Sequence, residues 1–421
     1  MIMKVLVTVL GRPRSKYIQV HWQVGQKIYN LFGPPARALV EHEQIDQALL
    51  LIPDSLVQHE READEWAANL GFPFQPLVLP SRYTPTVEGN VLDFYYTALF
   101  RFVDWFRSYH LESERPLTLI LEASTGLNVL QLLLYRAVLD FAQALAYTRE
   151  VELKVYTADP VTPQMAGRVV ALHLTESRPV PPALPRLGLK PDPKLLSPER
   201  VAAQDKEFRE KKKQLGAYWP WDEVRAFLGA VYQGIPLGIL TWCPTQEKAS
   251  EAWQVLHGLY SYAYQKTESQ DGKHKRLLAW TEWWRAYSLG MLLHLELYQH
   301  FHPVLQRWER CQLATLQDLE QVVARLYRDI PVLLNRFKSE QSLRIEVKDR
   351  TLPALLSELQ QSQSPVRKDS ERPGPDMRNF FAHMGFERHT VEVDKLPDGQ
   401  SGFRYHERHR KTIARILSKS I

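Results

Sequence analysis

The sequence predicts two domains of different class: an N-terminal α/β domain built on a Rossmann-like parallel sheet, and a C-terminal all-α domain. Strand-like and helix-like segments alternate through the first third of the chain, which is typical of a parallel sheet. Apolar residues in the second half recur at helical spacing instead. Seven prolines between Arg178 and Pro198 exclude a helix there and indicate an extended connection. We therefore expect the domains at 1–178 and 216–421, with a proline-rich linker and a bridging helix at 179–215.

The elements of the N-terminal domain follow from short apolar runs. Strands are expected at 4–10, 47–52, 76–79, 117–122 and 151–157, and helices at 90–110 and 127–147. A strand at 168–174 is expected at the edge of the sheet. Ligands of open parallel sheets bind outside the carboxyl ends of the strands, so the loops after the first and fourth strands are the candidate binding loops.

The C-terminal domain is predicted to be a set of helices. They are expected at 221–232, 245–266, 275–300, 315–337 and 353–362, with a final basic helix at 403–420. Aromatic and apolar residues recur at helical spacing within the third of these, at Trp280, Trp283, Trp284, Tyr287, Met291 and Leu295. This pattern favours core packing over a base-stacking platform. The lysines of the bridging helix at 211–213 are expected to be solvated.

Composition limits the class of protein. A chain of 421 residues with 44% apolar residues can bury two cores. Two cysteines, Cys243 and Cys311, cannot build a disulfide framework or a cysteine-rich zinc site, and they indicate a reducing compartment. No signal peptide and no apolar run of bilayer length is seen, so we expect a soluble, cytoplasmic protein without a membrane partner.

Charge is distributed unevenly along the chain. Residues 1–180 carry 16 Lys and Arg against 19 Asp and Glu, whereas the remainder carries 37 against 29. A positive surplus attracts polyanions but does not prove that they bind.

The most informative segment, Arg378-Asn379-Phe380-Phe381-Ala382-His383, lies in this basic half. On a helix, Asn379 and His383 share one face, so the amide can orient the imidazole, and the long stem of Arg378 can bring its guanidinium to a phosphate nearby. RNA supplies its own nucleophile, the 2′-hydroxyl, so a protein has only to move protons and stabilise charge. These three residues are the candidate catalytic set, with no metal ligand. Because one histidine cannot be base and acid in the same event, we infer that a second subunit contributes another copy.

Helix signals surround this segment. Pro375 follows a glycine and breaks the chain, Asp376 can cap the helix, and Gly385 follows its end. Phe380 and Phe381 offer an apolar anchor. A surface helix that carries an arginine and a capped histidine without any catalytic role is the competing interpretation.

Two loops at the predicted carboxyl edge of the sheet are candidate anion sites. The first begins at Gly11 and Arg12 and offers three cations and a tyrosine. The second contains Ser124, Thr125, Gly126 and Asn128, where a glycine permits close approach and hydroxyls and amides at a helix start can hold phosphate. The alternative is that the first loop is merely hydrated and that the second merely caps a helix.

The run from Arg378 to Gly385 resembles the nuclease motif of HEPN domains, in particular that of the CRISPR-associated ribonucleases that join an N-terminal CARF sensor to a C-terminal HEPN domain. Thr125, Gly126 and Asn128 are similar to the turn that CARF domains place over their ligand. The resemblance implies a type III CRISPR endoribonuclease that cleaves single-stranded RNA as a homodimer or higher oligomer. Its activator would be a cyclic oligoadenylate, with the tetra-adenylate expected, and it would need no cofactor.

Two other functions remain open at this stage. A nucleotide-sensing adaptor or nucleic-acid-binding regulator would bind without cutting, although the complete Arg, Asn and His set argues against it. A stand-alone HEPN toxin would not need the sensor-like sheet.

Overall fold

The computed structural model describes the chain except residues 1, 11–16, 32, 55, 58–61, 63–69, 71, 82–86, 110–114, 126–127, 198–204, 266, 271–272, 277, 341–351 and 361–374. The chain forms two compact units. Unit 1 comprises Met1–Pro181, Lys194–Glu210 and His257–Leu289, and unit 2 comprises Pro182–Pro193, Lys211–Leu256 and Gly290–Ile421. No helix in the described part is both long enough and apolar enough to cross a membrane.

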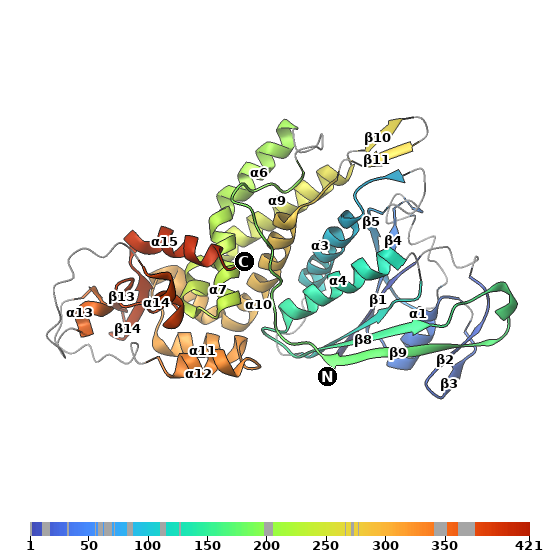
Figure 1. The fold of residues 1–421 in the computed structure, drawn as a ribbon, viewed down its shortest axis with the longest axis horizontal. Helices are drawn as coiled ribbons and strands as arrows, with labels where there is room; N and C mark the ends of the chain where they lie inside the picture. The colour runs from blue at the N-terminus through green and yellow to red at the C-terminus, as the bar shows by residue number, and fades with distance from the viewer. Residues whose placement is uncertain are drawn as a thin grey trace. The chain divides into compact units, whose positions relative to one another are not determined.

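Unit 1 is built on an eight-stranded, mainly parallel sheet (Figure 1). Its strands are β1 (Met3–Val9), β2 (His21–Val24), β3 (Lys27–Tyr29), β4 (Gln47–Pro53), β5 (Gln75–Leu79), β7 (Leu117–Glu122), β8 (Val151–Ala158) and β9 (Val169–Pro179), in the order β3-β2-β9-β8-β7-β1-β4-β5. The five from β8 to β5 are parallel, and β8 pairs with β9 in the antiparallel sense. The central strands are buried along almost their whole length, as expected when helices cover both faces.

The five parallel strands confirm the strands predicted from apolar runs, but the predicted edge position of 168–174 is wrong. Strand β9 pairs with β8 on one side and with β2 on the other, so it is internal. The edge belongs to β3, which pairs only with β2. Strands of three and four residues are too short to show an alternating pattern, and for that reason the sequence did not reveal them.

Helices lie on both faces of this sheet. Helices α3 (Leu92–Tyr109) and α4 (Asn128–Leu145) pack against each other and against β5, β7 and β8. On the other face, α1 (Pro35–Glu43) buries Ala36 and Leu39 against Leu6 and Ile120 of the sheet. The core of unit 1 is therefore a sheet between two helical layers. A small sheet of β6 (Val87–Glu88), β10 (Thr267–Gln270) and β11 (Lys273–Arg276) also belongs to unit 1.

The residues 257–289 were expected in the C-terminal domain, and they group with unit 1 instead. A buried ion pair ties them to α4: Nη2 of Arg285 lies 2.7 Å from Oδ2 of Asp140, and both side chains are almost fully buried. In addition, Oδ1 of Asp93 accepts a hydrogen bond from the backbone amide of Trp280 at 2.8 Å. An unpaired charge inside a core is costly, so Arg285 stays with its carboxylate.

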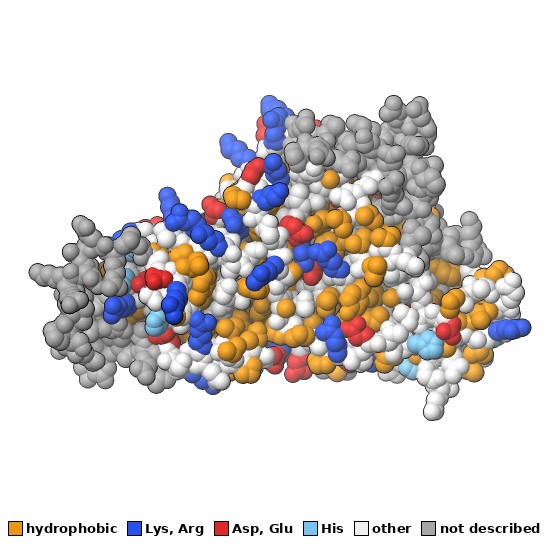
Figure 2. Space-filling model, in the orientation of Figure 1, with side chains coloured by type: hydrophobic (Ala, Val, Ile, Leu, Met, Phe, Trp, Pro, Cys, Tyr) orange, Lys and Arg blue, Asp and Glu red, His pale blue; other side chains and the backbone are white. Residues whose placement is uncertain are grey.

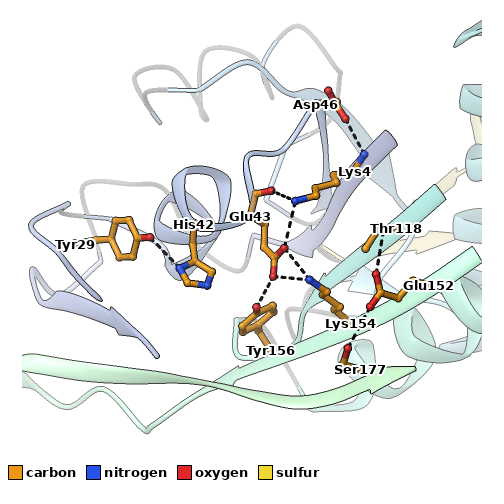
Figure 3. Close-up of polar contacts among 10 residues, drawn as sticks. All are labelled: Lys4, Tyr29, His42, Glu43, Asp46, Thr118, Glu152, Lys154, Tyr156 and Ser177. Atoms are coloured by element: carbon orange, nitrogen blue, oxygen red, sulfur yellow. Dashed lines mark hydrogen bonds and ion pairs between the residues drawn. The ribbon is translucent and has the colours of Figure 1, made fainter. Parts of the chain in front are cut away.

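A second buried carboxylate joins α1 to the sheet. Figure 3 shows Glu43 at the end of α1 between Tyr156 and Lys154 of β8 and Lys4 of β1. Tyr156 donates to Oε1 at 2.5 Å, and Nζ of Lys154 lies 3.0 Å from Oε2. Burial raises the pKa of Glu43, but the hydrogen bonds from Tyr156 and Lys154 and the charges of Lys154 and Lys4 outweigh this effect, so its net pKa lies below the ordinary value.

This cluster predicts a pH-dependent contribution to stability. Because the folded-state pKa of Glu43 is lowered, its contribution is complete above the unfolded pKa and is lost as the pH falls through the folded pKa. We expect Glu43→Gln to reduce the free energy of unfolding by about 3 kcal/mol at pH 7, measured by urea titration. The deficit should shrink in acid. Glu41→Gln, at an exposed position of the same helix, is the control, and an equal effect of both changes would contradict the prediction.

Unit 2 is mainly helical. Its elements are α7 (Trp221–Gln233), α8 (Pro236–Trp242), α11 (Leu316–Leu326), α12 (Pro331–Lys338), α13 (Leu356–Gln360), α14 (Met377–Ala382) and α15 (Glu407–Ser418), with a sheet of β12 (Ala354–Leu355), β13 (Val391–Lys395) and β14 (Ser401–Tyr405). Helices α6 (Lys206–Tyr218), α9 (Gln246–Gln265) and α10 (Glu282–Cys311) contribute residues to both units.

Most predicted helices of this half are confirmed, with four differences. The helix expected at 353–362 begins later, because Ala354–Leu355 form β12 and α13 spans Leu356–Gln360. The helix expected at 315–337 is two helices, since Pro331 begins the second one and lacks the amide that a helix interior needs. The expected 275–300 helix starts at Glu282 and continues past Pro303 to Cys311, with non-helical backbone angles at Phe301. The final helix starts at Glu407, because the residues before it form β14. The predicted aromatic packing is confirmed: Trp284 and Tyr287 of α10 are buried, and so is Trp280, which lies just before the helix.

Candidate functional site

The segment with the candidate catalytic residues forms the short helix α14, as predicted. The carboxylate of Asp376 accepts hydrogen bonds from the backbone amides of Arg378 at 2.8 Å and Asn379 at 3.4 Å, so the predicted N-cap is confirmed. His383 ends the helix, and its amide donates to the carbonyl of Asn379 at 3.0 Å. This arrangement places the arginine in the first turn and the histidine at the end.

Contacts from the rest of unit 2 fix the position of α14. Phe380 is fully buried, with its ring centroid 6.1 Å from that of Tyr405. The guanidinium of Arg336 in α12 donates to the carbonyls of Phe381 and Ala382. These bonds satisfy acceptors that the end of a helix leaves without partners.

Gly385 makes the sharp exit from α14 possible. Its φ is +85°, a conformation that disfavours side chains, and a Cβ there would lie 2.5 Å from Cγ2 of Ile235. A larger residue would push the helix end away from α8. The glycine predicted to follow the motif is therefore required by the packing.

The polar groups of α14 face outward. Arg378, Asn379 and His383 are all exposed, and the side chain of His383 is 52% exposed. Its Nδ1 lies 3.1 Å from Oε2 of Glu340, whose own side chain is only 10% exposed. Among the described residues, the carboxamide of Asn379 makes no hydrogen bond to the ring, so its orienting role stays a prediction. When Nδ1 carries the proton and donates it to Glu340, Nε2 keeps a free lone pair.

A second carboxyl lies below this surface. Glu387 is 8% exposed, and burial raises its pKa, although the amide of His389 and the charges of Arg388 and His383 act in the opposite direction. A carboxyl with a raised pKa keeps its proton to higher pH than a free glutamate. The charge of the neighbouring Asp376 acts in the same direction as burial.

The candidate ligand site lies in unit 1, at the carboxyl ends of β7 and β8. A cavity of about 460 Å³ is lined there by residues that include Ser124, Thr125, Asn128, Trp22 and Asp159. Its position agrees with the general rule for open α/β sheets. Of the residues predicted from sequence, Ser124, Thr125 and Asn128 line this cavity, whereas Gly11, Arg12 and Gly126 lie outside the described residues.

The loop at this cavity is held by a buried carboxylate that the sequence did not reveal. Oε2 of Glu122, at the end of β7, accepts hydrogen bonds at 2.6 Å from the hydroxyls of Thr8 and Thr125. Oε1 accepts one from the amide of Ser124 at 2.7 Å. The hydroxyl of Ser124 in turn accepts from the amide of Ala158 at 2.6 Å. The hydroxyls of Ser124 and Thr125 are thus hydrogen-bonded within the protein. Of the three predicted residues that line the cavity, Asn128 is the exposed one.

Metal ligation has no candidate in the part of the chain that the structure describes, where no group of three or more His, Cys, Asp or Glu side chains converges. His406 and His409 lie next to each other, with ring centroids 6.0 Å apart, but Arg408 also contacts His409. A cation beside both rings opposes metal binding.

Comparisons with known proteins bear on the N-terminal part of the chain. Residues 5–160 match the family model described as CRISPR system endoribonuclease Csx1, CARF domain. The mainly parallel sheet of unit 1 is therefore the sheet of a CARF domain, followed by a mainly helical C-terminal part. The expected CARF domain is confirmed, and the HEPN identity of the helical part stays a prediction.

Two relatives extend the comparison. The CRISPR system endoribonuclease Csx1 of Methanocaldococcus jannaschii is 23% identical over 325 residues, which are 75% of this chain and 65% of that protein, so the chain spans just under two thirds of its length. The solved structure of Enterococcus italicus Csm6 bound to cyclic hexa-2′-fluoro-hexa-dAMP has 12% sequence identity to this chain. The match covers 88% of this chain and 73% of the Csm6 chain. Its TM-score of 0.24 is too low to carry an argument about the fold.

The Glu122 network predicts how firmly the ligand loop is held. In Glu122→Gln, the carboxamide nitrogen cannot accept the hydrogen bonds that the threonine hydroxyls now donate. We expect the free energy of unfolding to fall by about 2 kcal/mol, and the Ser124 amide to exchange its hydrogen faster by mass spectrometry. Glu150→Gln, at an exposed position before β8, should change neither value. Unchanged exchange in Glu122→Gln would show that the carboxylate does not hold the loop.

Proposed function

We propose that this chain is a metal-independent endoribonuclease of the HEPN type, active in type III CRISPR defence and switched on by a cyclic oligoadenylate bound to its CARF domain. The observation that supports this most strongly is the arrangement of α14. This capped helix carries the exposed Arg378 in its first turn and the exposed His383 at its end. The CARF match and the endoribonuclease relative support the same class.

The chemistry assigns a separate task to each residue. Nε2 of His383 would accept the proton of the RNA 2′-hydroxyl, which then attacks the adjacent phosphorus. Arg378 would neutralise the charge that builds up on the phosphate oxygens. The 5′-oxygen of the next nucleotide leaves with a proton, and the products are a 2′,3′-cyclic phosphate and a 5′-hydroxyl end. Because the nucleophile belongs to the substrate, no metal-bound water is required.

Two copies of the motif would share one site. A single imidazole that has just accepted a proton cannot at the same moment donate one to the leaving oxygen on the far side of the phosphorus. A twofold axis would supply the second imidazole and the second guanidinium from the same residues of a partner subunit. The exposed position of Arg378 and His383 leaves them accessible to such a partner.

Glu340 has the role of a positioning residue in this proposal. Its largely buried carboxylate on Nδ1 would select the tautomer with a free Nε2 and fix the plane of the ring. Asn379, which was expected to orient the ring, remains in the proposed set as an exposed polar group beside the phosphate.

The CARF cavity is the proposed activator site. Its volume of about 460 Å³ lies within the usual range of small-molecule sites, and Asn128 and the amides at the start of α4 can meet a phosphate. A cyclic ligand with repeated adenylate units suits two such cavities related by twofold symmetry. Activation requires that the ligand bind one arrangement of the chain more tightly than another.

The central test is cleavage of a quenched fluorescent RNA in EDTA, with and without cyclic oligoadenylates of different ring size. We expect cleavage only with activator, and a rate lower by a factor on the order of 10²–10⁴ in His383→Ala or Arg378→Ala. His302→Ala, which removes an exposed histidine elsewhere in unit 2, is the matched control. RNA that stays intact under all conditions would identify an adaptor, and cleavage without activator would identify a toxin.

The contact of Glu340 with the imidazole gives a separate prediction. We expect Glu340→Ala to lower kcat about 100-fold with little change in KM for RNA, because the ring loses its orientation while the phosphate contacts remain. Glu340→Gln should recover part of the rate, since its carboxamide oxygen can still accept from Nδ1. The ¹⁵N chemical shifts of the His383 ring would report the change of tautomer.

Glu320→Ala, at an exposed position of α11, controls for the loss of one surface carboxylate. A rise in KM at constant kcat, or an unchanged ring tautomer in Glu340→Ala, would rule out the positioning role.

A further inference from the structure

One face of α15 and its C-cap residue carries four exposed cations, Arg408, Lys411, Arg415 and, at the C-cap, Lys419, which we call the α15 stripe. At 100° per residue, the four positions fall within an arc of about 80° and extend over roughly 16 Å of helix. Figure 2 shows Lys and Arg side chains over α15. The spacing therefore produces a line of positive charge along one helix.

The α15 stripe has no acidic partner among the described residues. The one acidic residue of the helix, Glu407, pairs with Arg410 instead, at 3.3 Å. Arg408 donates from Nε to His409 at 2.8 Å, and burial together with the charges of Arg408, His406 and His389 lowers the pKa of His409. The start of the helix is thus a region of positive potential.

Such a line of charge is unfavourable for the helix itself. The pairs Lys411 and Arg415, and Arg415 and Lys419, are like charges four residues apart, an arrangement that destabilises a helix by about 0.2–0.5 kcal/mol per pair. Ordinary solvated faces mix both signs and avoid this repulsion. A bound polyanion would remove it.

The opposite face of α15 is fixed to the core of unit 2. Ile413 and Leu417 are fully buried, and α15 packs against α7. A Cβ at Gly229 of α7 would lie 2.2 Å from the carbonyl oxygen of Leu417, so the two backbones are in close contact. The α15 stripe is therefore held facing away from α7 on a rigid support.

The stripe begins beside the residues that follow the candidate catalytic histidine. The amide of His406, the N-cap of α15, donates to the carbonyl of Thr390 at 2.8 Å. Glu387, three residues before Thr390, is close enough to Arg388 and His383 for their charges to act on its pKa. Arg388 donates from Nε to the ring of His389 at 3.2 Å, and His389 is close enough to His409 of α15 for its charge to act on the pKa of that ring.

We propose that the α15 stripe binds the backbone of the single-stranded RNA substrate and guides it to Arg378 and His383. The identity of the polyanion as RNA rests on the proposed function. Contacts with phosphates carry no sequence information, so the α15 stripe would contribute affinity and direction but no base preference. Lysine and arginine on a rigid helix suit the regular spacing of phosphates along a strand.

Binding can be tested separately from cleavage. In the full-length chain with His383→Ala, the affinity for a fluorescent single-stranded RNA would be measured by anisotropy at several salt concentrations. Two double variants, Arg408→Gln with Lys411→Gln and Arg415→Gln with Lys419→Gln, each remove two charges from exposed positions. We expect each to bind about tenfold more weakly and to lower the slope of log affinity against log salt by about 1.4, because each phosphate contact on a single strand contributes about 0.7.

Lys213→Gln combined with Lys395→Gln removes two exposed lysines from other elements of unit 2 and should leave both quantities unchanged. Equal affinity and equal salt slope in the stripe variants and their parent would overturn the proposal. Equally strong binding of duplex DNA with the same slope would overturn the assignment to an RNA strand. If the wild type does not cut RNA but the stripe variants still lose binding, the proposed function fails and the α15 stripe stands as an RNA-binding surface.

Discussion

A helix of six residues is too short to be stable by itself, and the candidate catalytic groups lie on such a helix. Its geometry therefore depends on contacts made at both ends. Asp376 satisfies the first amides, Arg336 satisfies the last carbonyls, and Phe380 fills the core beneath. Together these contacts place Arg378 and His383 at opposite ends of a rigid segment. The same helix without them would populate many backbone conformations, and the two side chains would rarely meet one phosphate.

The features of this site that could be predicted from the sequence are those that depend on neighbouring residues. The cap at Asp376 and the turn at Gly385 lie within three residues of α14, so local helix rules were sufficient to identify them. Glu340 is 43 positions from His383, and Arg336 is 45 from Phe381. Neither position has a local feature that distinguishes it from other charged residues, because their roles arise from how α12 packs beside α14.

The same distinction holds for the sheet: its strands could be predicted from short sequence segments, but the pairing of strands far apart in the sequence could not. The buried parallel strands each carry enough apolar residues in sequence to be recognised, but their order in the sheet is seen only in the structure. The position of β9 could not be inferred, since it depends on β2, a strand more than a hundred residues earlier. Glu122 is a mixed case: two of its hydrogen bonds come from Ser124 and Thr125 in the loop that follows, whereas the third comes from Thr8 and forms only because β1 lies alongside β7.

The two candidate sites differ in how their polar and charged groups are arranged, and this difference agrees with the tasks that we propose for them. In the CARF cavity, the hydroxyls of Ser124 and Thr125 are bonded within the protein, so the loop is preorganised and offers backbone and amide groups to its ligand. Around α14, Arg378 and His383 are exposed, and two carboxyls lie near the histidine: Glu340, 3.1 Å from its ring, and the buried Glu387, whose pKa is raised by burial. A site that holds one small ligand gains from fixed dipoles, whereas a surface that attracts a polyanion gains from exposed positive charge. In the second case a carboxylate such as Glu340 can remain only where it has a separate task, which we propose is to orient the His383 ring.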